Sequence, residues 1–402
     1  MTSHHAANET SASQRTRARD LVASAARRRR DSPGRETAPE ANLELSLTPD
    51  ERLERSEAWM ATFIEQLGDE GKSLLPVTQT LLADGRRGLE RIESEGPDAT
   101  LDEAAEVGLE AIIETDGTRP VLLVQDDALN SAAVAATGDW QTLLGSSQKE
   151  ISQIVRAVGR VNDPSHAQRF QGTAFMVAPG ILMTNRHVLQ GIAAEDDGRW
   201  TLRDDITVDF AQEYKRDRMA RFAIREVLFA GPDLIDVFSI DHDLLDLALL
   251  RVEAETLDRR WPLPLPITVR PEADDVPRAV VVSGFPGDPQ SSVATTLKKK
   301  LFDLIFGYKI LAPGRVKKGA GEIAGNGRNW SIGHDATTLP GNSGSCIIDI
   351  ESGAEVMALH YAGAQEVVNF AHVLGLVGNE KAGTTGKSLL ELLKAEGAVL
   401  RT

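Results

Sequence analysis

The sequence predicts a mainly β protein, with a disordered tail and a small helical module ahead of the β-rich part. From about residue 168 onward, short apolar runs such as "GTAFMVA", "LALLRV" and "RAVVVSGFP" alternate with Gly, Pro and Asp. Many short strands separated by turn residues are typical of an antiparallel sandwich or a pair of barrels. A parallel sheet would instead alternate its strands with helices.

The N-terminal region divides into a tail and a helical module. Residues 1–41 are rich in Ser, Ala, Arg, Glu and Pro and lack apolar periodicity, so we expect them to be disordered. Residues 42–116 are expected to form the helical module. Its first helix should begin after Thr48, because "TPDE" offers a cap, a proline in the first turn and Glu51 as the partner of a capping box. Two further helices are predicted at about 72–93 and 100–115.

Residues 117–164 are predicted to link the module to the β-rich part. The run "RPVLLVQDD" predicts a strand followed by a loop. "SQKE", from Ser147 to Glu150, is a second capping-box pattern. The apolar stripe that follows it, ending at Val158, predicts a helix that lies against the next domain. That domain is placed at residues 165–402.

Composition and charge exclude several classes of protein. The chain has 402 residues, of which 41% are hydrophobic, and a formal charge of −16. An acidic chain is poorly suited to general nucleic-acid binding, which needs basic surface to displace counterions, and we interpret the short basic runs as solvated surface. No stretch approaches the ~18 apolar residues of a membrane helix, and the N-terminus lacks the apolar core of a secretory signal. A cytoplasmic location without a membrane partner is therefore expected.

Cysteine and histidine usage adds two expectations. The single Cys346 cannot form an intramolecular disulfide, which agrees with a cytoplasmic location. Its setting, "SCIIDI", favours a small buried side chain over a nucleophile. The eight histidines are scattered along the chain, so we predict neither a metal site nor a cofactor.

Three segments carry the residue types that nucleophilic acyl transfer needs. "TNRHV" places His187 after two apolar strands, "DLALL" places Asp246 at the start of a buried strand, and "GNSGS" places Ser343 on a tight turn. In such chemistry a histidine removes the serine proton, and a carboxylate orients the imidazole and stabilises its cation. Two rivals remain: Asp243 for the acid and His242 for the base.

These segments resemble the chymotrypsin-like (trypsin-fold) serine endopeptidases, particularly the bacterial branch that includes the glutamyl endopeptidases. The resemblance covers residues 165–395 and keeps the order His, Asp, Ser. It implies two six-stranded antiparallel Greek-key barrels, at about 165–265 and 275–395. It also implies an oxyanion hole made by the backbone N–H groups of Gly341 and Ser343. The α/β-hydrolase elbow, G-x-S-x-G, does not fit, because position 345 is Ser.

The resemblance also bears on activation and specificity. Digestive members carry an Asp just before the serine, which pairs with a newly released N-terminus, but this chain has the uncharged Asn342 there. The position linked to Lys/Arg preference is Thr337. Thr337, Thr338 and His360 resemble the glutamyl pattern, which implies a pocket for an acidic P1 side chain. The alternative is that His360 packs within its strand and the pocket takes a small or apolar side chain.

The leading hypothesis is a serine endopeptidase that acts on polypeptides through an acyl-enzyme on Ser343. Its N-terminal helices would regulate or localise it, through a protein partner if one binds there. A catalytically inactive scaffold of the same fold that grips peptides is an alternative, and so is an effector protease that a partner activates.

Overall fold

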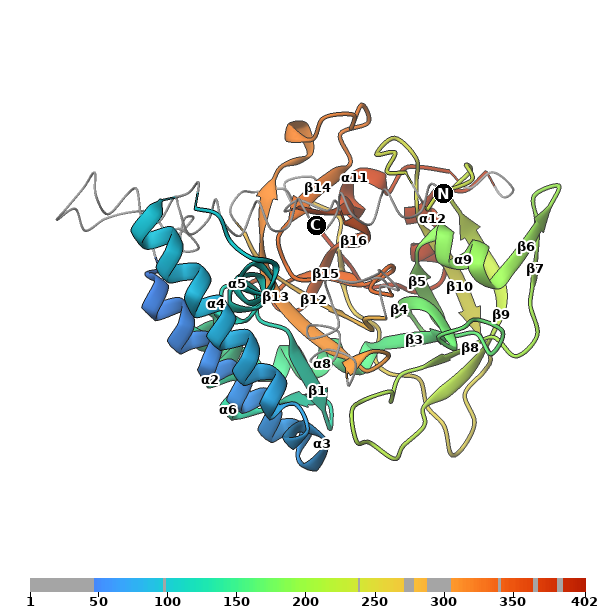
Figure 1. Ribbon diagram of the computed structural model, residues 1–402. Helices are drawn as coiled ribbons and strands as arrows, with labels where there is room; N and C mark the ends of the chain where they lie inside the picture. The colour runs from blue at the N-terminus through green and yellow to red at the C-terminus, as the bar shows by residue number, and fades with distance from the viewer. Residues whose placement is uncertain are drawn as a thin grey trace. The chain divides into compact units, whose positions relative to one another are not determined.

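The computed structural model (Figure 1) describes most of the chain beyond residue 46. The described residues are 47–96, 99–237, 239–270, 278–287, 305–338, 341–363, 368–381 and 386–402. They divide into two compact units. A helical unit holds the described residues up to Pro120 together with Asn130–Ser146, and a β unit holds Val121–Leu129 and the described residues from Ser147 onward. The predicted tail at 1–41 lies outside the described residues, and the predicted domain boundaries stay predictions.

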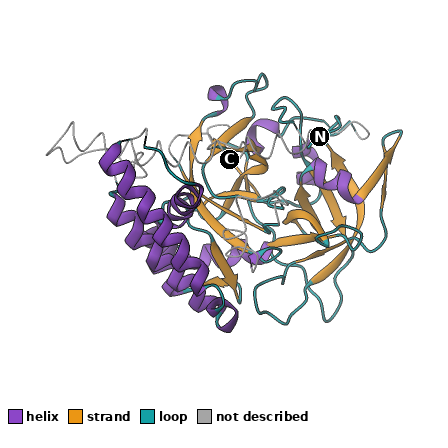
Figure 2. Ribbon diagram, in the orientation of Figure 1, coloured by secondary structure: helices purple, strands orange, loops and turns teal. Residues whose placement is uncertain are grey.

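The helical unit contains the helices that the apolar periodicity predicts, together with shorter ones (Figure 2). Its α-helices are α2 (Pro49–Leu67), α3 (Asp69–Lys72), α4 (Leu75–Glu95), α5 (Glu103–Thr115), α6 (Ser131–Ala135) and α7 (Gln141–Ser146). The capping box at the start of α2 is confirmed: the Glu51 backbone N–H donates to Thr48 Oγ1 at 3.0 Å, and the Thr48 N–H donates to Glu51 Oε2 at 2.7 Å. No helix within the described ranges is both long and apolar enough to cross a membrane.

Small residues allow α4 and α5 to approach closely. A Cβ on Gly85 would lie 2.5 Å from the backbone oxygen of Gly108, so the two backbones meet where only glycine fits. Around this contact, apolar side chains from α2, α4, α5 and the segment between the last two form one core. Its members are Leu53, Leu89, Ile92, Ala99, Leu101, Ala105, Leu109 and Ile112.

Six strands of the β unit close the first barrel in the order β10-β5-β4-β3-β8-β9. They are β3 (Val158–Asn162), β4 (Phe170–Ala178), β5 (Ile181–Thr184), β8 (Thr207–Asp209), β9 (Arg221–Ala230) and β10 (Ala248–Val252). α8 (Gln148–Ala157) leads directly into β3, so Val158 belongs to a strand and not to the predicted helical stripe. The second predicted capping box is wrong, because the Ser147 side chain makes no capping hydrogen bond to a described residue.

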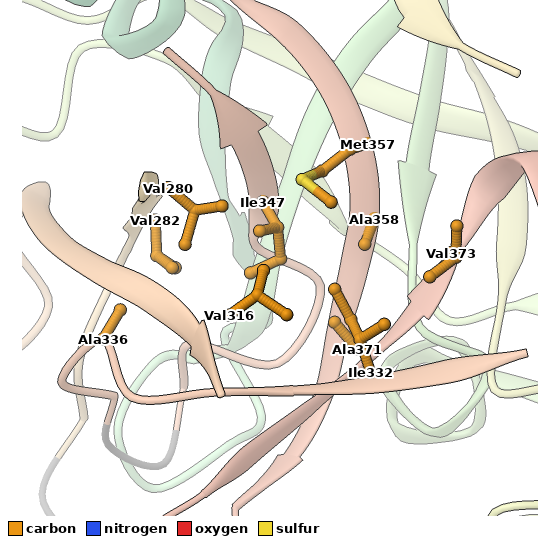
Figure 3. Packing of buried hydrophobic residues seen from close by; sticks show 10 residues of the cluster. All are labelled: Val280, Val282, Val316, Ile332, Ala336, Ile347, Met357, Ala358, Ala371 and Val373. Carbon is orange, nitrogen blue, oxygen red and sulfur yellow. The ribbon is translucent and has the colours of Figure 1, made fainter. Parts of the chain in front are cut away.

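Six more strands form the second barrel in the order β12-β15-β16-β17-β14-β13, which the pairing of β12 with β13 closes. They are β12 (Ala279–Gly284), β13 (Ile310–Lys318), β14 (Ser331–His334), β15 (Cys346–Asp349), β16 (Glu355–Gly363) and β17 (Asn369–Val373). Buried side chains such as Val280, Ile347 and Met357 fill its interior (Figure 3). The prediction of two six-stranded antiparallel barrels is confirmed.

Shorter elements extend the two barrels. β1 (Leu122–Gln125) pairs antiparallel with β13 and with β2 (Ala128–Leu129). β11 (Ile267–Thr268) pairs parallel with β16 and with β18 (Leu400–Arg401). The remaining elements of the β unit are β6 (Ala193–Asp196), β7 (Arg199–Leu202), α9 (Arg186–Ile192), α11 (Leu374–Val377) and α12 (Leu389–Ala395).

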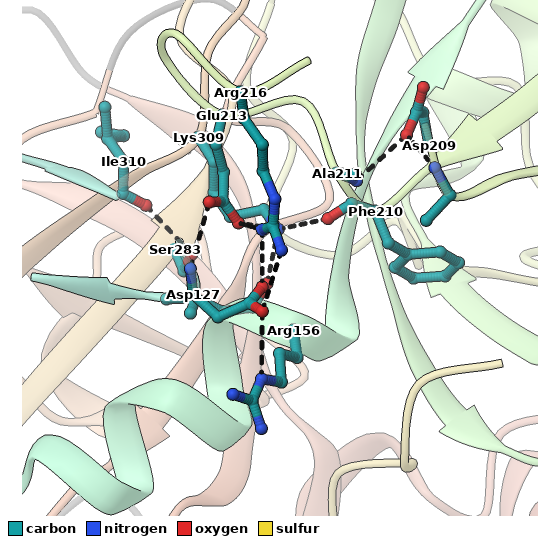
Figure 4. Close-up of polar contacts among 12 residues, drawn as sticks. Asp127, Arg156, Asp209, Phe210, Ala211, Glu213, Arg216, Ser283, Lys309 and Ile310 are labelled. Atoms are coloured by element: carbon teal, nitrogen blue, oxygen red, sulfur yellow. Dashed lines mark hydrogen bonds and ion pairs between the residues drawn. The ribbon is translucent and has the colours of Figure 1, made fainter. Parts of the chain in front are cut away.

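A polar cluster with a buried centre at Lys309 and Glu213 joins the β1–β2 turn to the first barrel (Figure 4). Asp127 accepts two hydrogen bonds from Arg216, at 2.9 and 3.1 Å, and also pairs with Arg156. Beside them the fully buried Lys309 donates to backbone oxygens of α8 and of the segment after β8, and lies 3.7 Å from Glu213. Burial lowers the pKa of Lys309 to about 8. The β1–β2 hairpin is therefore an integral part of the β unit.

Candidate active site

His187 lies in the first turn of a short helix that follows the β4–β5 hairpin. The hairpin turns at Gly180, whose φ of +73° is in the left-handed region that favours glycine. One residue, Asn185, separates β5 from α9 (Arg186–Ile192). Asn185 Nδ2 donates to the backbone oxygen of Asp246 at 2.8 Å, which ties the start of this helix to the segment before β10.

Asp246 contacts His187 through both carboxylate oxygens. The ring nitrogen Nδ1 of His187 lies 2.6 Å from Oδ2, and the backbone N–H of His187 donates to Oδ1 at 2.9 Å. Because a carboxylate only accepts, Nδ1 carries a proton, and in the neutral ring the lone pair is therefore on Nε2. Burial alone would raise the pKa of Asp246, but the charge that a protonated His187 would carry and the hydrogen bonds from His187 outweigh it and hold that pKa below its usual value. His187 is therefore poised to accept a proton at Nε2.

The two rival residues make other contacts. The carboxylate of Asp243 is exposed and accepts a hydrogen bond from the backbone N–H of Arg328 at 2.9 Å. The ring of His242 is buried, and its Nδ1 lies 2.6 Å from the hydroxyl of Tyr361. The geometry therefore pairs His187 with Asp246, as the sequence argument prefers.

Ser343 lies in a tight turn between two glycines with left-handed backbone. The φ angles are +93° at Gly341 and +87° at Gly344. A Cβ at Gly341 would lie 2.5 Å from the backbone oxygen of Phe285, and one at Gly344 would overlap the backbone oxygen of Thr173. From the first barrel, the Thr173 N–H donates to the Ser343 oxygen and its Oγ1 donates to the Gly341 oxygen, each at 2.9 Å. The first barrel thus fixes the turn of the second.

Two backbone amides of this turn are without a hydrogen-bond acceptor among the described residues. Neither the Gly341 nor the Ser343 N–H donates to another residue that the structure describes. Leu339 and Pro340, which precede the "GNSGS" segment, lie outside the described residues. Two free donors on a glycine-rich turn beside a serine hydroxyl can bind an oxygen on which negative charge develops.

The side chains of Asn342 and Ser345 are buried beneath the same turn. Both side-chain polar atoms of Asn342 and the Ser345 hydroxyl lack a hydrogen-bond partner among the described residues. Both side chains lie against Gly284, because a Cβ on that residue would overlap Ser345 Oγ and lie 2.6 Å from Asn342 Oδ1. Asn342 is 1% exposed, so its neutral amide avoids the cost of an unpaired buried carboxylate at this position.

The predicted pocket residues occupy two segments. Thr337 and Thr338 are half-buried ahead of the Ser343 turn. His360 is buried in β16, and its Nδ1 lies 3.3 Å from Nε2 of His334. Burial, and then the charges that His334 and His187 would carry, hold the pKa of His360 well below its usual value. Its imidazole is therefore neutral at physiological pH.

A family model described as "Trypsin-like peptidase domain" matches residues 172–359, a range that includes His187, Asp246 and Ser343. The chain carries a trypsin-like peptidase domain. This match, together with the two barrels, makes the chain a serine-type endopeptidase of the trypsin-like fold.

The chain is also similar to individual proteins. A protein from Lysobacter enzymogenes, named as a probable serine protease, is 28% identical over 312 residues, which cover 73% of this chain and 79% of that protein. Two solved structures of lower identity are also similar. Rv3671c of M. tuberculosis H37Rv, in an inactive form, is 20% identical over 62% of this chain and 92% of that chain, with a TM-score of 0.36. The serine endoprotease of Yersinia pestis is 18% identical over 62% of this chain and 67% of that chain, with a TM-score of 0.35.

Asp246 also makes a contact that the sequence does not predict. The backbone N–H of Asp246 donates to Nε2 of His372 at 3.1 Å. His372 stands in "NFAHV", which reads as an ordinary strand, and lies 126 residues away along the chain. No local signal marks it.

Neither the single cysteine nor a cluster of metal-binding side chains among the described residues offers an alternative reactive group. Cys346 is fully buried, and burial raises the pKa of its thiol to about 12, so it stays protonated at neutral pH. Within the described ranges, no three His, Cys, Asp or Glu side chains are grouped so that they could hold a metal ion.

Proposed function

We propose that this peptidase cleaves polypeptides with a triad of Ser343, His187 and Asp246. Ser343 Oγ attacks the scissile carbonyl while His187 Nε2 takes its proton, and the histidine then protonates the leaving amine. Water hydrolyses the resulting acyl-enzyme by the same route in reverse. The observation that carries the proposal is the double contact of Asp246 with His187, at 2.6 and 2.9 Å, because it fixes the tautomer that a general base needs.

The proposed oxyanion hole consists of the backbone N–H groups of Gly341 and Ser343. Their free donors support this role, and so do the contacts from Thr173 that hold the turn. Loss of one such donor typically lowers kcat by about 10²- to 10³-fold.

A fluorophosphonate probe tests the triad directly. We expect covalent labelling of the wild type at Ser343 and none of Ser343→Ala. His187→Ala should label at least about 10²-fold more slowly, because the general base is lost. A folded wild type that neither labels nor cleaves any protein in a proteome digest would replace this proposal with the inactive peptide-binding scaffold.

For specificity, we propose a pocket for an acidic P1 side chain. Thr337 and Thr338 can offer hydroxyl donors to a carboxylate, and His360 can offer a neutral N–H. The packing of His360 favours a second candidate, because the residue is 4% exposed and its ring already pairs with His334. In that case the imidazole is part of the pocket floor, and the pocket accepts a small or apolar P1 side chain.

Peptide-library profiling decides between the two pockets. Cleavage after Glu and Asp, reduced at least tenfold in Thr337→Val, supports the acidic pocket. Cleavage after Ala, Val or Leu that Thr337→Val leaves unchanged supports the second candidate.

We further propose that the helical unit regulates or localises the peptidase, through a protein partner. Because β1 pairs with β13, a truncation that removes it would damage the peptidase itself. The residues Asn130–Ser146 also belong to the helical unit. A suitable variant therefore deletes residues 1–120 and keeps β1. Unchanged activity, bound proteins and cellular location in this variant would refute the proposal, and activity that appears only when a partner is added would favour partner activation.

The proposed location is the cytoplasm, supported by the single cysteine of the chain. Cell fractionation tests it, and recovery of the full-length protein outside the cytoplasm would contradict it.

A further inference from the structure

His372 holds the acid of the triad from the opposite barrel. It lies on β17 of the second barrel and is fully buried, whereas Asp246 precedes β10 of the first. The Asp246 backbone N–H can only donate, so His372 Nε2, 3.1 Å away, must accept and carries no proton. The ring proton therefore sits on Nδ1, which lies 3.0 Å from Ser331 Oγ. One imidazole thus bridges the two barrels in a defined tautomer.

The ring of His372 is itself tightly held. It stacks on the ring of Tyr361 with centroids 4.1 Å apart and an interplanar angle of 13°. The ring of Trp330 packs edge-on against the ring of His372, with centroids 5.9 Å apart. The hydroxyl of Tyr361 bonds to Ser331 Oγ at 3.2 Å. We call His372, Ser331, Tyr361 and Trp330 the second-barrel clamp.

The clamp also holds the segment ahead of the acid. Trp330 Nε1 donates to the backbone oxygen of His242 at 2.6 Å, and the Tyr361 hydroxyl lies 2.6 Å from His242 Nδ1. Together with the bond from Asp246 to His372, these contacts fix residues 242–246 at both ends. His242, a rival base in the sequence, therefore serves as an attachment point of the segment that carries the acid.

Resting on the proposed triad, we propose that His372 is a positioning residue for Asp246. The carboxylate must face both the ring and the backbone N–H of His187, and its place follows from the place of its own backbone. A shift of the Asp246 amide therefore displaces both contacts to His187. Because Ser343 stands on the second barrel, the bond to His372 also fixes the acid and base relative to the nucleophile.

A neutral His372 is required for this role, and its surroundings keep it neutral. Burial lowers the pKa of His372 to about 4, although the nearby charge of Asp246 opposes the shift. At neutral pH its Nε2 lone pair therefore remains available to the Asp246 N–H.

Two variants of His372 separate positioning from mere packing. His372→Gln can place an acceptor near the position of Nε2, whereas His372→Asn reaches only the position of Nδ1. We expect His372→Asn to lower kcat and the rate of fluorophosphonate labelling of Ser343 by about 10- to 100-fold, with KM changed less than threefold, since small misplacements of catalytic groups cost about this much. His372→Gln should recover most of that loss.

The controls keep the result interpretable if His372→Asn is destabilised. Val373→Ala removes buried apolar volume from the next residue of β17 and should lower the melting temperature without changing kcat at 25 °C. Ser331→Ala is a milder second variant, because it keeps the ring of His372 and removes only the hydroxyl that Nδ1 and the Tyr361 hydroxyl contact, and should lower kcat about 3- to 10-fold. The deshielded NMR proton of the His187–Asp246 hydrogen bond should persist in His372→Gln and shift or vanish in His372→Asn.

The outcomes distinguish this inference from the proposed function. If the wild type labels at Ser343 but His372→Asn and Ser331→Ala keep its kcat and its deshielded proton, only the positioning role of His372 is overturned. If His372→Gln is as impaired as His372→Asn, the ring acts through packing and the role is again overturned. A folded wild type that never labels overturns the triad, and the positioning role with it.

Discussion

The attachment of the serine turn to the first barrel predicts a large effect from one isosteric change, Thr173→Val. Thr173 is fully buried, and its Oγ1 donates to the Gly341 oxygen at 2.9 Å and accepts from the Phe285 N–H at 3.1 Å. Valine keeps the shape, so no cavity forms, but both backbone groups lose their partner. Each orphaned group costs about 1 to 3 kcal/mol, so the free energy of unfolding should fall by about 2 to 6 kcal/mol.

The same change should lower activity, because the turn carries both proposed oxyanion donors. We expect kcat to fall by about 10- to 100-fold. For a unit of this size the melting temperature should drop by at least about 4 °C. Thermal unfolding followed by circular dichroism, and kcat on a selected peptide, measure the two effects. Thr173→Ser is the matched control, since it keeps the hydroxyl and loses only a methyl group. If Thr173→Val matches Thr173→Ser in both measurements, the reasoning is refuted.

Three further predictions follow from single groups near the site. Gly341→Ala should lower kcat by about 10²-fold or more, whereas Gly353→Ala, with a similar φ of +92° but open space around it, should cost only about 1 to 2 kcal/mol of stability. Asn342→Asp should destabilise the fold increasingly as pH rises above about 4, because an unpaired buried carboxyl resists ionisation. The pKa of His372 is near 6.5 in the unfolded chain but about 4 in the folded protein. This difference contributes about 3 kcal/mol to the free energy of unfolding, which is fully present above pH 6.5 and is lost as pH falls toward 4.

Unfolding curves and kinetics at several pH values check these predictions. Equal kcat values in the Gly341→Ala and Gly353→Ala variants would show that the backbone conformation at Gly341 does not affect catalysis. A stability deficit of Asn342→Asp that does not vary with pH would mean that the new carboxylate finds a cationic partner. If His372→Gln shows the same acid destabilisation as the wild type between pH 6.5 and 4, another group is responsible for it.

Local sequence patterns were sufficient to predict several strands and to single out His187 and Asp246, whose side chains are in contact. The apolar runs ended by Gly and Pro predict β4, β5 and β10 because each strand is buried along most of its length. The preference for Asp246 over Asp243 comes from the family resemblance, which places the acid directly before the "LALL" run. The Ser147 cap failed for a local reason: α7 ends at Ser146, and Ser147, at φ −105° and ψ 21°, lacks the extended backbone that an N-cap needs.

The supports of the site could not be predicted, because they join distant segments. Thr173 reads as one more residue of an apolar strand, yet its hydroxyl reaches Gly341, 168 residues later. His372 likewise reads as a strand residue, and only the closed second barrel brings it to Asp246. The three sequence segments contain only the residues of the proposed triad. Thr173 and His372 reach those segments through contacts between the two barrels.

Each barrel holds a segment of the other that carries a residue of the proposed triad. Thr173 of the first barrel binds the turn that carries Ser343, and His372 of the second barrel binds the backbone of Asp246. The two attachments share no partner, so loss of either should shift His187 relative to Ser343 by an independent route, and their effects on the activation free energy should add. In the double variant Thr173→Val, His372→Asn, kcat should therefore fall by about the product of the single losses. If the kcat of the double variant is no lower than the kcat of the less active single variant, one attachment governs the placement of both barrels.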